Sequence, residues 1–262
     1  MGGISPAVRS SLESHGLSVC SADFEQKTFR DEAGYRRELF KAVNASGAGM
    51  VFPVGDTTAL SRCKALLPEG VLAAVEDEQK IGILGQKVPF SCLMSRMGIR
   101  QPYLYSSIDE AEGKDIIFKR NVSYGGHGVH RPRDRKALMN LIAHQPDGEP
   151  YLIEEYIEGE DYSVDAIRFG ENFTASAYKV LDAKGNGPST SRMVMHCPSL
   201  EDTAKSIMDE LSFKGICGFD FKVDANGKAY ILECNPRFTG GISTQIESGF
   251  DIPFLLWQGF TA

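Results

Sequence analysis

The chain has 262 residues, of which 42% are hydrophobic and 24% are charged, and its formal net charge is −7. This composition is typical of a folded protein with a large buried core and two or three subdomains. The acidic balance excludes general nucleic-acid binding, which needs a basic surface. No apolar run approaches the ~20 residues of a membrane-spanning helix, and the N-terminus lacks a signal-peptide pattern. We therefore expect no nucleic-acid partner, no membrane partner and a cytoplasmic location.

The six cysteines are scattered along the chain and form no Cys-x-x-Cys pair. That spacing is typical neither of a zinc site nor of a short disulfide-rich secreted protein. Reduced, buried thiols are the expected state.

The first 80 residues alternate helical and strand patterns. Helices are expected over 6–13 and 35–43, and short buried strands over 17–20, 49–54 and 71–75. This alternation predicts βαβ units and a small parallel sheet. Such folds usually bind ligands at a glycine-rich turn after the first strand, but Gly2 and Gly3 open this chain with no strand before them. Either the sheet lacks its first strand or the natural protein starts further upstream.

Two further units follow in the chain. A helix is expected over 87–97, because Gly98 and Pro102 form a typical helix stop. The second unit, residues 109–156, has strands at 116–119 and 151–157, a glycine-rich turn at 125–128 and a helix over 133–143. The third unit starts at Asp161 and has strands at 162–169 and 174–180, a polar loop over 182–192, a helix over 200–211 and a packed terminal helix over 250–260.

Residues 218–237 predict a β-hairpin. Asn226-Gly227 is a strong signal for a two-residue type I′ turn, in which both central positions need positive φ. The turn sets the register, and side chains alternate between the two faces. Asp220 then lies opposite Glu233 on a polar face. The opposite face is apolar and carries Phe219, Phe221, Val223, Tyr230, Leu232 and Cys234.

Two carboxylates held face to face are destabilising unless a positive charge compensates them. Carboxylate and amide oxygens suit Mg²⁺ or Mn²⁺, so Asp220, Glu233 and Asn235 form a candidate metal site. Arg237 follows directly and offers a planar fork for an anion. The alternative is a solvated polar face on which Lys222 relieves the repulsion.

The polar residues come in a characteristic order: Lys87, Lys119 before a glycine-rich turn, Glu154-Glu-Tyr-Ile157, Asp161, and then Asp220, Glu233, Asn235 and Arg237. This order resembles the ATP-grasp superfamily over almost the whole chain, in the style of relatives of biotin carboxylase and carbamoyl-phosphate synthetase. The nucleotide-binding spacing is also similar to that of D-alanine–D-alanine ligase. The resemblance implies a combined α/β and α+β fold, with a small Rossmann-like domain over 1–86, an ATP-grasp lid over 87–157 and a C-terminal ATP-grasp subdomain over 158–262.

The resemblance also implies the parts of an ATP site. Lys87 and Lys119 would contact phosphates as flexible point charges. Many relatives have an acid before the first lysine where this chain has Gln86, so Lys80 is a rival to Lys87. Glycines let backbone N–H groups approach an anion, and the implied flap residues are Ser123, Gly125, Gly126 and Gly128.

The remaining implied roles concern the base, the ribose, the metal and the reacting groups. Asp161 would accept from the ribose hydroxyls, and Asn235 would bind the metal and, with Arg237, act at the reacting carboxylate or acyl-phosphate. The implied adenine-binding hinge is Glu154, Glu155 and Ile157.

The function implied by the resemblance is an ATP- and Mg²⁺-dependent ligase. It would activate a small-molecule carboxylate as an acyl-phosphate, join it to an amine and release ADP. Two alternatives stay open: a carbamoyl-phosphate synthetase-like enzyme that uses bicarbonate or carbamate, and an inactive ATP-binding regulatory protein. A homodimer is a further option, because dimers are common among the relatives.

Overall fold

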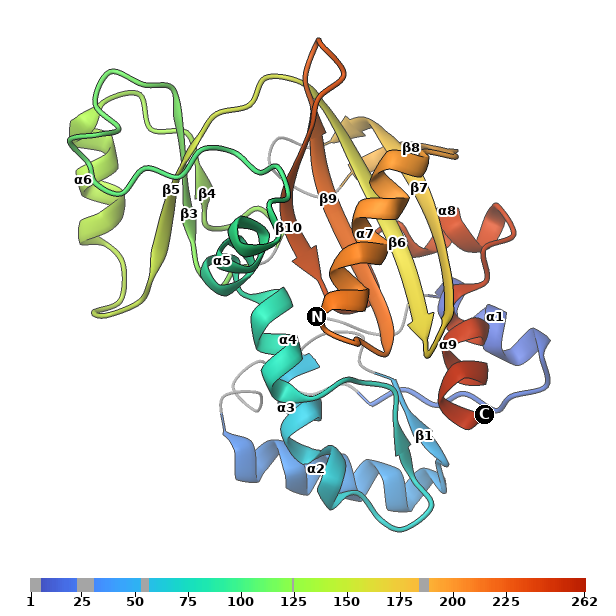
Figure 1. Cartoon of the computed structure of the whole chain (residues 1–262). Helices are drawn as coiled ribbons and strands as arrows, with labels where there is room; N and C mark the ends of the chain where they lie inside the picture. The colour runs from blue at the N-terminus through green and yellow to red at the C-terminus, as the bar shows by residue number, and fades with distance from the viewer. Residues whose placement is uncertain (1–5, 23–30, 53–56, 124, 184–188) are drawn as a thin grey trace.

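The computed structural model describes residues 6–22, 31–52, 57–123, 125–183 and 189–262. The described strands form three sheets of two, five and three strands. Figure 1 shows the five-stranded sheet at the centre, the three-stranded sheet to one side of it, and the two-stranded sheet below both. The predicted combination of α/β and α+β structure is confirmed.

The N-terminal part contains a short parallel sheet. Its elements are α1 (Pro6–Ser14), α2 (Glu32–Ser46), β1 (Met50–Val51), α3 (Thr57–Cys63), the 3₁₀ helix η2 (Lys64–Leu66) and β2 (Leu72–Ala73). Strands β1 and β2 pair in parallel around α3, which is the expected βαβ connection. Two strands alone do not establish a Rossmann-like domain, and the prediction about the first strand lies outside the described residues.

The predicted strand over 17–20 is wrong, because the chain is irregular there. Leu17 and Val19 are half-buried against an apolar cluster that includes residues of α1 and of the C-terminal helix α9 (Ile252–Thr261). In Figure 1, α1 lies beside α9 and away from α2. Leu17 and Val19 are two positions apart, so their burial gives the sequence the alternation typical of a strand, although none of the described strands pairs with this segment. The predicted terminal helix is confirmed, and it buries Ile252 and Leu256.

Within the stretch predicted as the lid, the chain forms a three-stranded antiparallel sheet covered by one helix. It comprises β3 (Ile116–Arg120), β4 (Val129–His130), α6 (Arg135–Ala143) and β5 (Tyr151–Glu155), with strand order β4-β3-β5. Helix α6 starts at Arg135 because the Asp134 side chain caps it by accepting from the Ala137 amide at 2.8 Å. Leu138 of α6 packs on Phe118 and Ile153 in a core of its own.

The central sheet is antiparallel throughout, with strand order β10-β9-β6-β7-β8. The strands are β6 (Glu160–Phe169), β7 (Asn172–Ala183), β8 (Ser189–Met195), β9 (Gly215–Val223) and β10 (Ala229–Asn235). Helix α7 (Pro198–Glu210) covers one face, where Leu200 and Ile207 join Phe219 and Phe221 in the largest apolar core. The predicted loop over 182–192 is wrong at both of its ends, because β7 continues to Ala183 and β8 starts at Ser189.

The turn of the β9–β10 hairpin differs from the predicted one. Gly227 has a positive φ of 76°, whereas Asn226 does not have the positive φ that a type I′ turn needs. The Gly227 amide donates to the Asp224 carbonyl at 2.9 Å, and the Asp224 amide donates to the Lys228 carbonyl at 3.0 Å. The loop therefore has three residues, and the pairing next to it moves by one position.

A bulge further along the hairpin restores the predicted register. Phe221 lies opposite Ile231 rather than Leu232, and Ile231 is buried in the core. The register shifts between Ile231 and Glu233, because an extra residue on one strand takes up one position. Beyond the bulge, Glu233 lies opposite Asp220, as the sequence predicts.

Two consecutive helices lead from the N-terminal part to the three-stranded sheet, and the second lies within the range predicted as the lid. They are α4 (Glu78–Gly85) and α5 (Lys87–Met97). Helix α5 matches the predicted 87–97 and ends at Gly98, whose φ is 67°. The last short helix, α8 (Ile242–Glu247), follows β10. In Figure 1, α5 lies beside β10 and α4 lies below α5, between the three-stranded sheet and the N-terminal part.

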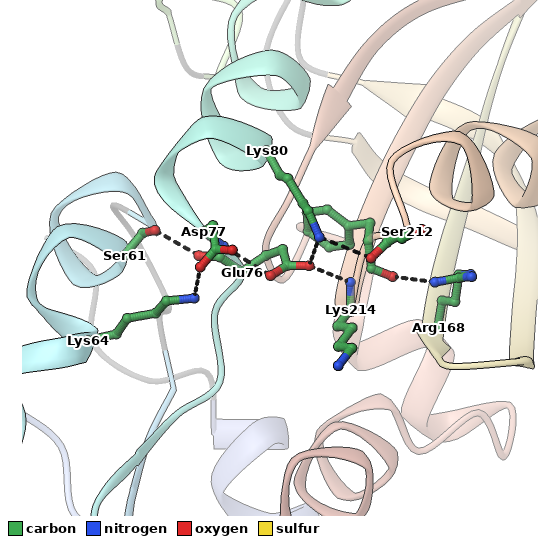
Figure 2. Close-up of polar contacts among 9 residues, drawn as sticks. Ser61, Lys64, Glu76, Asp77, Lys80, Arg168, Ser212 and Lys214 are labelled. Atoms are coloured by element: carbon green, nitrogen blue, oxygen red, sulfur yellow. Dashed lines mark hydrogen bonds and ion pairs between the residues drawn. The ribbon is translucent and has the colours of Figure 1, made fainter.

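A buried carboxylate fixes the base of α4 to the central sheet. Glu76 is 8% exposed, and Figure 2 shows it between α4 and the turn that leads into β9. Its carboxylate accepts from Lys80 Nζ at 2.8 Å, from the Lys214 amide at 3.0 Å and from the Asp77 amide at 3.1 Å. Three donors satisfy the buried charge, so this contact joins the two parts of the chain rigidly.

The turn before β9 is held by side chains from two other elements. Ser212 has a φ of 45°, the one positive value among the described non-glycine residues. Its carbonyl accepts from Lys80 at 3.1 Å, and the next carbonyl, of Phe213, accepts from Arg168 Nη1 of β6 at 3.2 Å. These contacts, drawn in Figure 2, stabilise a backbone conformation that serine rarely adopts.

Two other expectations concern membranes and cysteines. Within the described ranges, no helix is both long and apolar enough to cross a membrane. All six cysteines are free thiols. Cys63, Cys217 and Cys234 are buried as expected, whereas Cys20 and Cys92 are exposed.

Candidate functional site

The site is built on the polar face of the central sheet. Glu233 on β10, Asp220 on β9 and Ser163 on β6 are register neighbours across three adjacent strands. Ser163 Oγ donates to Asp220 Oδ1 at 2.5 Å, and Asn235 Nδ2 donates to Asp220 Oδ2 at 3.2 Å. The opposed carboxylates predicted from the hairpin are therefore present.

The two carboxylates have different electrostatic environments. Burial, and next the charge of Glu233, raise the pKa of Asp220 to about 7. Burial also acts to raise the pKa of Glu233, but Lys87 and Lys119 outweigh it and the pKa of Glu233 is lowered. The pair thus retains one readily ionised carboxylate and one that a proton or a cation would stabilise.

Both predicted phosphate lysines are buried and each lies beside a carboxylate. Lys87 Nζ is 3.0 Å from Glu233 Oε2 and 3.4 Å from the carbonyl of Ser123. Lys119 Nζ is 2.6 Å from Glu154 Oε2 and 3.5 Å from the carbonyl of Leu232. The lysines therefore converge on β10 from α5 and β3, whereas Lys80, the rival of Lys87, bonds to Glu76.

The sequence reasoning missed Asn121, which orients Lys87. Asn121 Oδ1 accepts from the Val88 amide at 2.9 Å, its amide group donates to Gln86 Oε1 at 3.0 Å, and its carbonyl accepts from the Lys87 amide at 3.0 Å. It therefore caps the start of α5 from a different segment, between β3 and the flap. No short-range pattern predicts such a cap, because its two halves are about 35 positions apart.

Asn235 and Arg237 form one hydrogen-bonded unit at the end of β10. Arg237 Nη2 donates to Asn235 Oδ1 at 3.0 Å, and Nη1 donates to the Phe238 carbonyl at 3.2 Å. The Arg237 amide also donates to the Asn235 carbonyl at 2.8 Å. The Asn235 side chain thus connects the Arg237 guanidinium to the Asp220 carboxylate.

The predicted flap is a turn between β3 and β4. Gly128 is buried and its carbonyl accepts from the Arg120 amide at 2.9 Å, whereas Gly125 is exposed. Ser123 is half-buried beside Lys87, and Gly126 has a positive φ. These four residues lie in the turn that the sequence predicts.

The predicted hinge begins in the last two residues of β5, Glu154 and Glu155, and continues into the connection to β6. The amide of Glu155 donates to the Tyr103 carbonyl at 2.8 Å, and the exposed Glu155 side chain accepts from the Tyr103 amide at 3.4 Å. Ile157 is half-buried in the connection to β6. Asp161, near the start of β6, is an exposed side chain that accepts from Lys222 at 2.7 Å.

Some of the predicted site residues line a common cleft. It lies between the start of α3, the α4–α5 junction, the flap and the end of β10, and five predicted residues line it: Lys87, Ser123, Glu233, Asn235 and Arg237. Thr57, Thr58 and Gly85 line the other side. The other predicted site residues are not among the described residues that line this cleft: the flap glycines Gly125, Gly126 and Gly128, the hinge residues, Asp161, Asp220 and Lys119.

The donor set suits a hard divalent cation that is shared with another ligand. Among the described residues, no cluster of three or more histidine, cysteine, aspartate or glutamate side chains could hold a metal by itself. Two opposed carboxylates and the amide of Asn235 are oxygen donors, and Mg²⁺ commonly combines one or two carboxylates with phosphate oxygens. The residues present therefore fit Mg²⁺ carried with a nucleotide.

Comparison with known proteins agrees with this geometry. Residues 147–262 match the family model "ATP-grasp in the biosynthetic pathway with Ter operon". The arginine-specific carbamoyl phosphate synthase large chain of Bacillus subtilis is 26% identical over 202 residues, covering 70% of this chain and 19% of that protein. The chain thus spans about one fifth of the length of the curated relatives that it matches.

Solved structures share the fold across most of the chain. A biotin carboxylase from Campylobacter jejuni, in complex with an ATP compound, superposes with a TM-score of 0.77 at 16% identity, covering 98% of this chain and 68% of that one. An L-amino acid ligase from Bacillus licheniformis gives a TM-score of 0.74 at 15% identity, covering 97% and 71%. At these identities the likeness establishes the fold.

Proposed function

We propose that this chain, which belongs to the ATP-grasp superfamily, is an ATP- and Mg²⁺-dependent ligase that joins a small carboxylate to an amine. The observation that carries the proposal is the opposition of Asp220 and Glu233 with the Lys87 ammonium 3.0 Å from Glu233. Burying two carboxylates together is costly unless cations compensate them. In a bound metal–nucleotide complex, the metal cation would compensate the two carboxylates and a phosphate would compensate the Lys87 ammonium.

The reaction would proceed in two displacement steps. A carboxylate oxygen of the substrate attacks the γ-phosphorus of ATP, the bond to the β-phosphate oxygen breaks, and ADP leaves. The amine nitrogen then attacks the acyl carbon, the bond to phosphate breaks, and the amine loses a proton to solvent. Phosphoryl transfer asks a protein mainly for positioning and charge stabilisation, so the chain needs no catalytic triad.

Each predicted site residue has a role in this scheme. Lys87 and Lys119 hold phosphate oxygens, which requires Lys87 to exchange its contact with Glu233 for a phosphate. Mg²⁺ would be held by Asp220, Glu233 and Asn235, and it would neutralise the β and γ phosphates. Arg237 binds the substrate carboxylate through its planar fork. Ser123, Gly125, Gly126 and Gly128 close over the phosphates and keep water from the acyl-phosphate.

The base and the sugar of the nucleotide would lie at the hinge. The amides of Glu155 and Tyr156 are bonded to the Tyr103 and Asp115 carbonyls, so we assign recognition of the adenine ring to the Ile157 amide and recognition of its amino group to Glu154. Asp161 would accept from the ribose hydroxyls in place of its contact with Lys222.

We place the reaction in the cytoplasm, where ATP is available, and propose a homodimer, to be tested by sedimentation.

The test is an ADP-release screen with single amino acids and hydroxy acids, with pairs of them, and with bicarbonate. We expect one carboxylate-amine pair to stimulate ADP release in wild type, and Glu233→Gln to abolish it while the fold stays intact. Stimulation by bicarbonate alone would favour a carbamoyl-phosphate synthetase-like reaction. If MgATP raises the melting temperature but no acid stimulates release, the chain is a nucleotide-binding regulator. Full turnover by Glu233→Gln would refute the assigned metal role.

A further inference from the structure

A second buried carboxylate lies on the same sheet face as Asp220. Asp165 is two positions after Ser163 on β6, opposite Gly218 of β9, and its side chain is 0% exposed. Residues two apart on a strand share a face, so Asp165 extends the polar row away from the cleft. The proposed chemistry assigns no role to it.

The partners of Asp165 come from the segment that follows β10. Thr239 Oγ1 donates to Asp165 Oδ1 at 2.9 Å, and Gln245 Nε2 donates to Asp165 Oδ2 at 3.3 Å. Gln245 Nε2 also donates to the Ser176 carbonyl of β7 at 3.0 Å, and the Gly241 amide donates to Thr239 Oγ1 at 3.2 Å. One buried carboxylate therefore fixes both the loop after Arg237 and the first turns of α8.

Close backbone packing reinforces this attachment. A Cβ atom at Gly218 would lie 2.1 Å from Thr239 Cγ2, and a Cβ atom at Gly241 would lie 2.6 Å from the hydroxyl oxygen of Tyr178. Glycine at both positions lets the loop lie directly on β9 and β7. The loop therefore lies close against the sheet, and the hydrogen bond between Thr239 and Asp165 is its central polar contact with the strands.

This loop directly follows Arg237, which the proposed function places at the reacting groups. Thr239 is two residues after Arg237, whose guanidinium bonds to Asn235 Oδ1 and to the Phe238 carbonyl. The Phe238 carbonyl is joined through one peptide bond to Thr239. A rotation of the Thr239 backbone would therefore move the acceptor that orients the Arg237 guanidinium.

We infer that Asp165 is a positioning residue, which acts through the Thr239 hydroxyl to aim the Arg237 guanidinium at the oxyanion of the bound substrate. The inference rests on the proposed function for the identity of that oxyanion, but not for the position of Arg237. A carboxylate suits the role because it accepts from Thr239 and Gln245 at once with charge-assisted strength. Arg192, whose charge acts on Asp165, lies near the loop as well.

A matched pair of variants separates positioning from bulk packing. Thr239→Val keeps the side-chain shape and removes the hydroxyl, whereas Thr239→Ser keeps the hydroxyl. In the free protein, the ¹⁵N–¹H side-chain signal of Arg237, assigned with Arg237→Lys, should shift or broaden in Thr239→Val and stay at the wild-type position in Thr239→Ser. If Thr239→Val does not fold, Asp165→Ala removes the same bond from the other side. An unchanged Arg237 signal in Thr239→Val, or in Asp165→Ala if that variant is used, overturns the inference.

Binding of inorganic phosphate to the MgADP complex provides a functional readout. Calorimetry should show about tenfold weaker phosphate binding in Thr239→Val, wild-type binding in Thr239→Ser, and unchanged MgADP affinity in both. Equal loss in both variants, or no loss in Thr239→Val, contradicts the inference. If wild type binds no MgADP, the proposed function fails instead, and the Arg237 signal alone decides the positioning role.

Discussion

Asp220 lies directly opposite Glu233 across the β9–β10 hairpin, and the two carboxylates are compensated unequally. Glu233 has the Lys87 ammonium at 3.0 Å, whereas Asp220 accepts from the neutral groups of Ser163 and Asn235. The ionised Asp220 carboxylate therefore lowers the stability of the free protein. The same carboxylate is needed to bind a metal, so a change that stabilises the free protein here should weaken metal binding.

Replacing that carboxylate should stabilise the free protein and abolish its metal-dependent function. The folded-state pKa of Asp220 is raised to about 7 from 3.8, so its ionisation in the folded state costs stability as pH rises from 4 to 7. At pH 8, Asp220→Asn should raise the free energy of unfolding by roughly 1–2 kcal/mol and remove Mg²⁺-dependent nucleotide binding. Urea titration checks the first effect. Asp202→Asn, an exposed change on α7, should do neither, and a destabilised Asp220→Asn would contradict the account.

The buried pair of Lys119 and Glu154 predicts a double-mutant cycle. The two side chains are only 7% and 6% exposed, and removal of one partner from a buried pair typically costs about 3–5 kcal/mol. Lys119→Met and Glu154→Leu should each destabilise the chain by roughly that amount. The double variant should recover most of the loss, while its nucleotide affinity stays low because the phosphate contact is absent. Additive losses in urea titration would indicate that the pair is not coupled.

Asp165 gives a pH-dependent prediction. Burial raises its pKa from 3.8 to about 6, although Thr239 and Gln245 act against the shift. A raised carboxyl pKa means that the folded state retains a proton that the unfolded state has lost between those values. Stability from this group is therefore complete below about pH 4 and is lost as pH rises to 6. The change is at most about 3 kcal/mol.

Comparison with Asp165→Asn isolates the effect of Asp165 ionisation on stability, because the asparagine does not titrate. The difference in unfolding free energy between wild type and Asp165→Asn should change between pH 4.5 and pH 7.5, in favour of the variant at the higher pH. Urea titrations at both pH values measure it. A constant difference would mean that Asp165 stays ionised throughout this range.

The junction at Glu76 predicts a local loss of stability. Glu76→Ala leaves the Lys214 amide without its buried acceptor and leaves Lys80 bonded to the Ser212 carbonyl, which should cost roughly 2–3 kcal/mol. Glu78→Gln is a matched control two residues away, where an exposed ion pair with Arg62 is worth less than about 1 kcal/mol. Hydrogen exchange should show faster exchange in α4 and in the turn before β9 for Glu76→Ala only. Uniform acceleration across the sheet would indicate global destabilisation rather than a local junction.

The sequence predicted the elements whose signals are local. The helix at 87–97 has a clear stop at Gly98, and the β9–β10 strands alternate polar and apolar residues. The opposition of Asp220 and Glu233 was predicted correctly although the turn type was wrong, because the longer turn and the bulge at Leu232 shift the register in opposite directions. A bulge has no composition signal of its own, so only the apolar pairing beyond it fixes the register.

Contacts between residues far apart in the sequence could not be predicted from local patterns. Asn121 caps α5 from another segment, and Glu76 bonds to the backbone of Lys214 more than one hundred positions away. Asp165 could have been predicted, because it lies two positions after Ser163 on β6 and so shares the sheet face that carries Asp220. Its partners could not, since Thr239 and Gln245 lie about 75–80 positions further along.

The most direct test is calorimetric binding of ADP with Mg²⁺ and with EDTA, to wild type and to Glu233→Gln. The account predicts that Mg²⁺ strengthens ADP binding to wild type by tenfold or more. Glu233→Gln should bind ADP equally with and without the metal. The same Mg²⁺ dependence in both proteins would show that the carboxylates of the β9–β10 hairpin do not hold the metal of the nucleotide.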